Sequence, residues 1–287
     1  MATPSRAIIF PIGMLTILVL LSAACGDGGG SSRGPEPSQH VSFLATATPT
    51  PTPTAQARVR TVAISAGHGG PGNVGAVHQN AQGQTDLVEK DLNLDVARRL
   101  DAQLRAAGYR TVLIRDGDYS LAPAVPGDFA ATVRAESQAR ADVANEAGAD
   151  IILAIHFNGS DDPTQSGTEV YYNPDRSFGE SSRVLASSIY DAIVARLREL
   201  GYDTRQRGVM DDGGTAAAAL TGEGHTFLLG ETPGFRSTQM PGMIGEALFV
   251  SNDTEALLLQ RDEVRQAIAQ AYKDGIDTYF AWLGGPD

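Results

Sequence analysis

The sequence predicts one α/β domain, with a largely parallel or mixed central sheet flanked by helices, of the phosphorylase/hydrolase-like kind. Three observations favour this class. Short β-branched runs alternate with segments of helical periodicity. One strand, DIILAIHFN at 150–158, has a seven-residue apolar run that only His156 interrupts, which is typical of a strand buried on both faces. The intervening helices are long enough for the crossover connections of a parallel sheet.

In the first half of the domain, three predicted strands alternate with two predicted helices. VRTVAIS at 59–65 is a β-branched strand, and a glycine-rich loop follows it. The segment 89–108 is a helix that ends at Gly108. Its apolar residues recur at helical spacing: Leu92, Val96, Leu100 and Leu104. YRTVLIR at 109–115 is the next strand, and a helix from about 129 to 147 leads into the strand at 150–158.

The second half continues the alternation. We expect a strand at 168–173, helices near 180–200 and 253–283, and between those helices the strand GMIGEALFV at 242–250.

Composition narrows the class of partner. The 287 residues carry 22 Lys plus Arg against 34 Asp plus Glu, a net charge of -12. Nucleic acid is therefore not an expected partner, because capture of phosphate backbones depends on Lys and Arg. The single cysteine excludes a disulfide within one chain, and a monomer is expected.

Residues 1–25 have the pattern of an export signal. Arg6 precedes a mostly apolar run at 7–21, which is shorter than the roughly 20 residues that span a bilayer. The run ends in LSAAC, which resembles a bacterial lipobox although Ser22 stands where Leu is usual. We expect lipidation of Cys25 and anchoring at the outer face of the membrane. An ordinary secretory signal or an uncleaved anchor is the alternative.

Residues 26–57 are expected to form a linker. They are rich in Gly, Ser, Pro and Thr and include TPTPTPT at 48–54, a composition that cannot bury a core. The folded domain would then occupy 58–287.

Four polar residues stand where a purely structural chain seldom places them: His68, Glu89, His156 and Glu246. His68 lies in ISAGHGG directly after a strand, and His156 is near the C-terminal end of a buried strand, the edge at which open α/β sheets bind ligands. Glycine loops and core histidines also occur without any ligand.

The two acids lie among apolar residues. Glu89 falls on the buried stripe of its helix, so its carboxylate needs a partner, and a metal ion is one such partner. It could instead belong to a capping box with Asp86. Glu246 interrupts an apolar strand, which indicates a functional role. The alternative is an ion pair with Arg115 or Arg140.

Together, two histidines and one carboxylate match a zinc site with one open position, and a second carboxylate nearby would deprotonate the bound water. Thiolate ligation is not expected because the one cysteine precedes the domain.

The folded region resembles the zinc-dependent N-acetylmuramoyl-L-alanine amidases of bacterial cell-wall turnover (amidase type 3). Four segments carry the resemblance in the family's order: ISAGHGG, EKDLNLDVARRLDAQLRAAGYRTVLIRD, ARADVANEAGADIILAIHFN and MPGMIGEALFVSN. It implies that His68, Glu89 and His156 bind Zn2+, and that Glu246 is the catalytic base. The implied substrate is peptidoglycan, at the amide between N-acetylmuramic acid and L-alanine.

Two departures from the family pattern stand out. Ser65 and Ala66 replace the usual Asp-Pro pair, which would weaken the groups that orient His68. The chain also carries an insert at 210–239, either a lid, a rim, an occluding segment or a tolerated surface insertion. Two rival functions stay open: a zinc carboxypeptidase or deacylase of the same fold, and a non-catalytic wall-binding lipoprotein.

Overall fold

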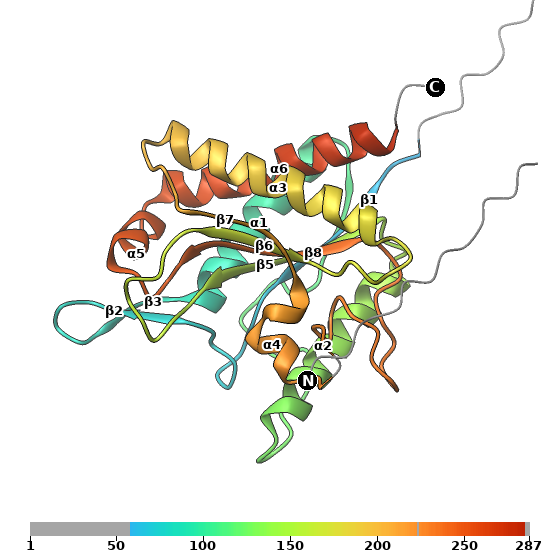
Figure 1. The fold of residues 1–287 in the computed structure, drawn as a ribbon, viewed down its shortest axis with the longest axis horizontal. Coiled ribbons are helices and arrows are strands. Elements are labelled where there is room, and N and C mark those ends of the chain that lie inside the picture. The colour runs from blue at the N-terminus through green and yellow to red at the C-terminus, as the bar shows by residue number, and fades with distance from the viewer. Residues whose placement is uncertain (1–57, 223, 285–287) are drawn as a thin grey trace, which may run out of the picture. The chain divides into compact units, whose positions relative to one another are not determined.

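The computed structural model describes residues 58–222 and 224–284 (Figure 1). The predicted signal at 1–25, with Cys25, and the predicted linker at 26–57 lie outside these residues. Within the described part of the chain, no helix is both long enough and apolar enough to cross a membrane.

A mixed sheet of six strands forms the centre of the domain, in the order β4-β1-β5-β8-β6-β7. The strands are β1 (Thr61–Ala66), β4 (Arg110–Leu113), β5 (Ile151–Asn158), β6 (Thr168–Tyr172), β7 (Gln206–Asp211) and β8 (Gly242–Phe249). All neighbours are parallel except β6 and β8, which run antiparallel. The predicted class, a single α/β domain with a largely parallel or mixed sheet, is confirmed.

Helices cover both faces of the sheet (Figure 1). The helices α1 (Glu89–Ala106), α3 (Gly179–Glu199) and α6 (Asp262–Leu283) contribute to one large apolar cluster on one face. On the other face, α2 (Phe129–Glu146) adds Ala141 and Ala144 to a smaller cluster. The two faces therefore differ in how heavily they are packed.

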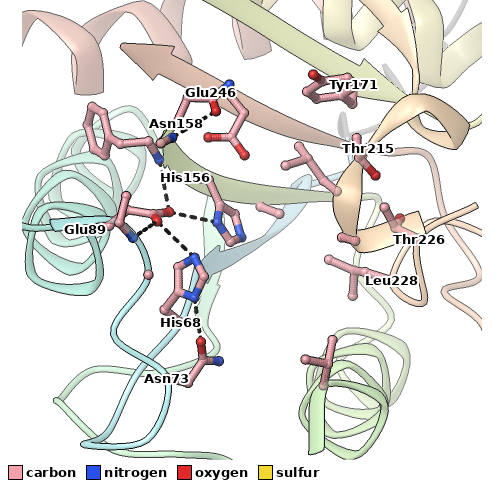
Figure 2. A pocket seen from close by; sticks show the side chains of 18 of the residues that line it. His68, Asn73, Glu89, His156, Asn158, Tyr171, Thr215, Thr226, Leu228 and Glu246 are labelled. Atoms are coloured by element: carbon pink, nitrogen blue, oxygen red, sulfur yellow. Dashed lines mark hydrogen bonds and ion pairs between the residues drawn. The ribbon is translucent and has the colours of Figure 1, made fainter. Parts of the chain in front are cut away.

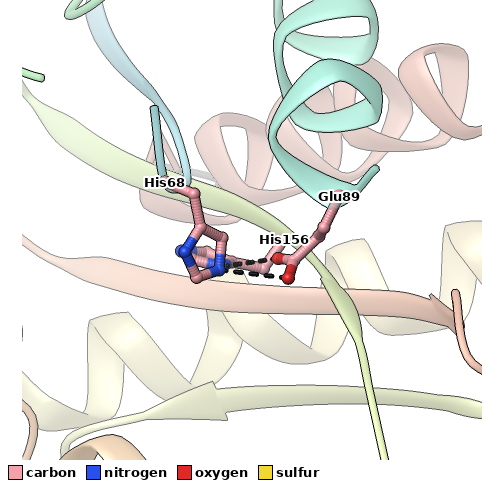
Figure 3. A group of neighbouring side chains, drawn as sticks. All are labelled: His68, Glu89 and His156. Carbon is pink, nitrogen blue, oxygen red and sulfur yellow. Dashed lines mark hydrogen bonds and ion pairs between the residues drawn. The ribbon is translucent and has the colours of Figure 1, made fainter. Parts of the chain in front are cut away.

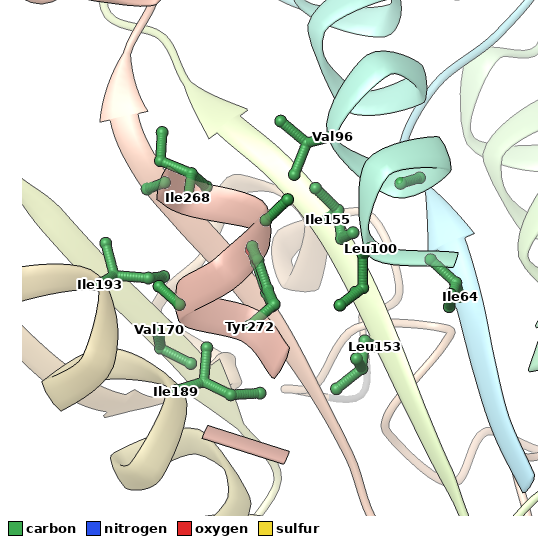
Figure 4. Close-up of a cluster of buried hydrophobic side chains, with 14 of the residues drawn as sticks. Ile64, Val96, Leu100, Leu153, Ile155, Val170, Ile189, Ile193, Ile268 and Tyr272 are labelled. Atoms are coloured by element: carbon green, nitrogen blue, oxygen red, sulfur yellow. The ribbon is translucent and has the colours of Figure 1, made fainter. Parts of the chain in front are cut away.

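Strand β5 is buried on both faces, as its sequence predicts. Ile151, Leu153 and Ile155 point into the larger cluster, where Leu153 and Ile155 lie near Leu100 of α1 (Figure 4). The alternate residues Ile152 and Ala154 belong to the smaller cluster. This alternation follows from the two-residue period of a strand, and it fixes the face of the sheet to which each β5 side chain points.

Three features differ from the sequence prediction. The helix expected at 253–283 is two helices, α5 (Asp253–Leu259) and α6, separated at Gln260 and Arg261. Arg265 stabilises this break, because its Nη1 donates to the carbonyls of Leu259 and Gln260 at the end of α5. No glycine or proline marks the break, so the pattern gave no signal for it.

The other two differences are elements that were not expected. A hairpin of β2 (Val77–Gln79) and β3 (Thr85–Val88) follows the glycine loop, and β7 closes one edge of the sheet. His78 is a buried residue of β2, and its ring nitrogens contact Asp86 and Asp253.

The insert at 210–239 begins in β7 and includes a short 3-10 turn (Asp212–Gly214) and the helix α4 (Ala216–Ala219). Two arginines of the domain donate hydrogen bonds to its backbone. Arg134 of α2 donates to the carbonyl of Pro233, and Arg176 donates to the carbonyls of Leu229 and Thr238. The stretch 229–238 of the insert is therefore attached to the domain.

Candidate metal centre and active site

His68 sits in the glycine-rich loop that follows β1. Its backbone has φ 57°, and the next two residues, Gly69 and Gly70, have φ 137° and 73°. A left-handed histidine is uncommon and often marks a functional position. Asn73 fixes the orientation of the imidazole ring, because its Oδ1 lies 2.6 Å from His68 Nδ1. This leaves Nε2 facing the carboxylate of Glu89, 3.1 Å away.

Glu89 is the first residue of α1 and its side chain is 4% exposed. The capping-box interpretation is wrong: the residue before the helix is Val88, which makes no side-chain cap, and Asp86 contacts His78 instead. Glu89 Oε1 lies 3.0 Å from His156 Nδ1, and Oε2 accepts a hydrogen bond from the amide of Ala76.

Burial alone would raise the pKa of the Glu89 carboxyl. The hydrogen bonds with His156 and His68 outweigh it and hold that pKa well below its ordinary value. Burial lowers the pKa of His156, which favours the neutral imidazole that a metal requires. Glu89 and His156 thus favour the protonation states of metal ligands. Burial lowers the pKa of His68, but the hydrogen bonds with Glu89 and Asn73 outweigh it and raise that pKa above its ordinary value, so a metal ion would compete with a proton at this ring.

The three side chains converge, as Figure 3 shows. The imidazole rings of His68 and His156 are 4.9 Å apart between centroids at an interplanar angle of 76°. One donor atom from each of the three residues lies within 4.8 Å of the others. Donor atoms about 2.0–2.1 Å from a tetrahedral zinc ion lie about 3.3 Å from one another, so the cluster fits such an ion with small adjustments.

Glycines permit this convergence. A Cβ on Gly67 would overlap the ring of His156, and one on Gly75 would overlap Glu89 Oε2. Both residues therefore allow the loop backbone to approach the ligand side chains.

Glu246 lies on β8 beside this cluster, in register with His156 on β5. Its Oε2 is buried and has no hydrogen-bond partner in the described structure. Burial raises the pKa of its carboxyl well above the ordinary value, and the charges of Glu89 and Glu169 act in the same direction. A carboxyl that holds a proton at higher pH is suited to general acid and base chemistry.

The alternative interpretation of Glu246 as an ion-pair residue is wrong. Arg115 is fully buried, and its guanidinium donates to the backbone carbonyls of Ala66 and Gly67. Arg140 donates to Ser65 Oγ and to the carbonyl of His68, and its acidic partner is Glu136. Both arginines support the loop that carries His68.

Ser65 was expected to weaken the support of His68, because an acid usually stands at its position in the family. In the structure the side chain that contacts the His68 ring from behind is Asn73, whereas Ser65 contacts Arg140. The replacement therefore changes a contact of the arginine and leaves the ring with a partner.

A cavity of about 1000 Å³ opens over the cluster. Figure 2 shows its two sides: His68, Glu89, His156 and Glu246 lie on one, and Thr215, Thr226 and Leu228 of the insert face them. The insert thus forms a wall of the cavity and leaves the cluster open to it.

Sequence reasoning missed several supporting residues. Asn93 is fully buried and donates to Glu89 Oε1, and its position four residues after Glu89 on one helix face was the available signal. Glu169 is 3% exposed and accepts hydrogen bonds from Asn158, Tyr171 and Arg207. The sequence feature that could have identified Glu169 is an acidic residue within the strand TEVYY.

The fold is that of known cell-wall amidases. The structure aligns with the CwlD amidase of Clostridioides difficile, solved in complex with the GerS lipoprotein, at a TM-score of 0.61 and 23% identity over 78% of this chain and 99% of that one. It aligns with the catalytic domain of the CwlV amidase from Bacillus (Paenibacillus) polymyxa at a TM-score of 0.55 and 24% identity, covering 77% and 98%.

The family model for N-acetylmuramoyl-L-alanine amidase matches residues 62–278. The amidase LytC of Bacillus subtilis is 31% identical over 68% of this chain, which spans 32% of LytC. The germination-specific amidase of the same organism is 27% identical over 78% of this chain and 81% of its own length. The chain belongs to the N-acetylmuramoyl-L-alanine amidase family.

Proposed function

We propose that this protein hydrolyses the amide between the lactyl group of N-acetylmuramic acid and L-alanine in peptidoglycan, with zinc as its metal. The convergence of His68, Glu89 and His156 beside the buried acid Glu246 is the observation that carries the proposal. Family membership supports the choice of bond.

The proposed roles follow from the chemistry of the donors. Two neutral imidazoles and one carboxylate would hold a zinc ion and leave it with a net positive charge. When bound, zinc would polarise the scissile carbonyl and lower the pKa of its water. Glu246 would take the proton of the attacking water and then deliver it to the amine of the leaving L-alanine.

The cavity supports a polymeric substrate. Its volume is about 1000 Å³, and it is lined by residues from β5, β6, β8, α2 and the insert. We propose that the domain acts outside the cytoplasm on the cell wall. Attachment through a lipidated Cys25 remains a prediction of the sequence.

The test combines metal analysis with product analysis. We expect about one zinc ion per purified chain, and from purified peptidoglycan the release of stem peptides with a free N-terminal L-alanine, leaving the glycan intact. Peptides shortened at their C-terminus would identify a carboxypeptidase and overturn the proposed bond. Wall binding without any released product, in a fully zinc-loaded protein, would show a binding function instead.

A further inference from the structure

One face of α2 lines the cavity opposite the metal centre. The residues are spaced along a single helix face: Phe129, Val133, Glu136, Ser137 and Arg140. The deep end of this face is polar, since Arg140 supports the His68 loop. Its outer end is apolar, and Phe129 there is 62% exposed.

The insert supplies matching apolar residues. Ala217 of α4 and Leu220 at its C-terminal end line the same cavity, and Leu220 is 37% exposed. Phe129, Val133, Ala217 and Leu220 are here called the apolar strip. Exposed apolar side chains contributed to one cavity by two separate elements indicate a ligand contact, because neither element needs them for the core.

The charges of the cavity indicate which part of the substrate binds there. Five carboxylates line it: Glu89, Glu136, Asp161, Glu169 and Glu246. Among the described lining residues the only arginine or lysine is Arg140, which is 6% exposed and donates to Ser65 and to the backbone. The carboxylates of a stem peptide would therefore meet no unpaired arginine or lysine among the described residues of this wall, and nothing there would compensate the cost of removing them from water.

The uncharged part of the substrate fits this wall better. N-acetylglucosamine is neutral, as is N-acetylmuramic acid whose lactyl carboxyl is joined to a stem peptide, and each pyranose ring has a C–H-rich face that an aromatic ring can cover while the hydroxyl groups stay in water. We propose that the apolar strip binds the glycan strand next to the cleaved muramic acid residue, with Phe129 stacked against a sugar ring. This inference rests on the proposed function and names the direction in which the glycan leaves the metal centre.

The test compares two substrates that carry the same stem peptide, a tetrasaccharide of the glycan and N-acetylmuramic acid alone. For Phe129→Ala and Leu220→Ala we expect kcat/KM on the tetrasaccharide to fall about tenfold, mainly through KM. On the single sugar we expect a change below about twofold. Leu257→Ala is the control, because Leu257 is 61% exposed on α5 and is absent from the cavity lining.

Two kinetic results would overturn the inference: equal losses on both substrates, or no loss on the tetrasaccharide. A loss that grows with the length of the peptide would assign the strip to the peptide, which also overturns it.

Calorimetric titration with an oligomer of N-acetylglucosamine, which carries neither stem peptide nor lactyl carboxylate, separates this inference from the proposed function. Binding that Phe129→Ala weakens supports the strip even in a protein that cleaves nothing, in which case only the proposed function fails. Absence of glycan binding by a wild-type protein that cleaves the single-sugar substrate would overturn the strip alone, and absence of both binding and cleavage would overturn both.

Discussion

His156 on β5 and Glu246 on β8 occupy partner positions in the register of two parallel strands. One residue belongs to the candidate ligand set and the other is the candidate base, so hydrogen bonds of the sheet backbone set the distance between them. Rigid strands position catalytic groups more accurately than loops do. His68 differs from these two residues because it lies in a loop and not on a strand. Glycines with positive φ and the contact with Asn73 fix the conformation of that loop.

Glu246→Gln tests the base. The amide keeps the shape of the side chain and cannot accept the proton of water, so we expect kcat to fall by at least about 10²-fold. Zinc content should stay unchanged, since Glu246 is outside the ligand cluster. The melting temperature should stay equal or rise, because the change removes a buried carboxyl without a partner on Oε2. Retained turnover in this variant would exclude Glu246 as the base.

Gly67→Ala tests the close approach of the loop to His156. The added methyl group would overlap the imidazole, so the ring must turn away from Glu89. We expect zinc affinity to fall at least about tenfold, as measured by competition with a chelator, and activity to fall with it. Gly72→Ala is the matched control, since a Cβ there meets no atom within 4 Å. Equal affinities for the two variants would contradict the geometry of this loop.

Asn73→Ala tests the orientation of His68. Removing the oxygen that lies 2.6 Å from Nδ1 frees the ring to rotate, and we expect zinc affinity to fall about 10- to 100-fold. Asn73→Asp keeps an acceptor and should restore most of the affinity. Ser65→Ala serves as the comparison, because Ser65 contacts Arg140 and should leave zinc binding nearly unchanged. An effect of Ser65→Ala as large as that of Asn73→Ala would show that orientation passes through the arginine instead.

The two acids of the candidate site could be predicted from the sequence because each is a charged residue within an apolar pattern. Glu246 interrupts an apolar strand and Glu89 falls on an apolar helix stripe, and the structure brings both of them to one cavity with His68 and His156. Their convergence follows from strand order, since β1, β5 and β8 are neighbours whose C-terminal ends share an edge.

The features that the sequence did not predict depend on loop conformation and on contacts between residues far apart in the chain. Asn73 reaches His68 only because the intervening glycines turn the loop back, and no periodicity describes such a turn. The separation of α5 from α6 depends on Arg265, whose side chain caps the end of the preceding helix. The path of the insert likewise depends on Arg134 and Arg176, which are distant from it in sequence.

The attachment of the insert near His225 should depend on pH. His225 Nδ1 lies 2.8 Å from Asp212 Oδ1 and its Nε2 lies 3.0 Å from Asp175 Oδ2, while Asp211 is 3.7 Å from Nδ1. Partial burial lowers the pKa of His225, but the hydrogen bonds with Asp212 and Asp175 outweigh it and raise that pKa above its ordinary value. Because the folded pKa is the higher one, the stabilisation is complete below the unfolded pKa of about 6.5 and is lost as pH rises through the folded value.

Hydrogen exchange at the amide of Thr226, which donates to Asp212, measures this attachment directly. We expect its protection factor, corrected for the intrinsic effect of pH, to decrease roughly two- to tenfold as pH rises from about 6 to about 9. The effect is modest because Asp175 is mostly exposed, with 77% of its side chain accessible. In His225→Gln the protection should be lower at pH 6 and independent of pH. His78→Gln removes another histidine between two carboxylates, far along the sequence in β2, and should keep the pH response of Thr226. The prediction would be contradicted if the pH dependence of Thr226 protection disappeared in His78→Gln and persisted in His225→Gln. The titrating group would then be His78 of the hairpin and not His225 of the insert.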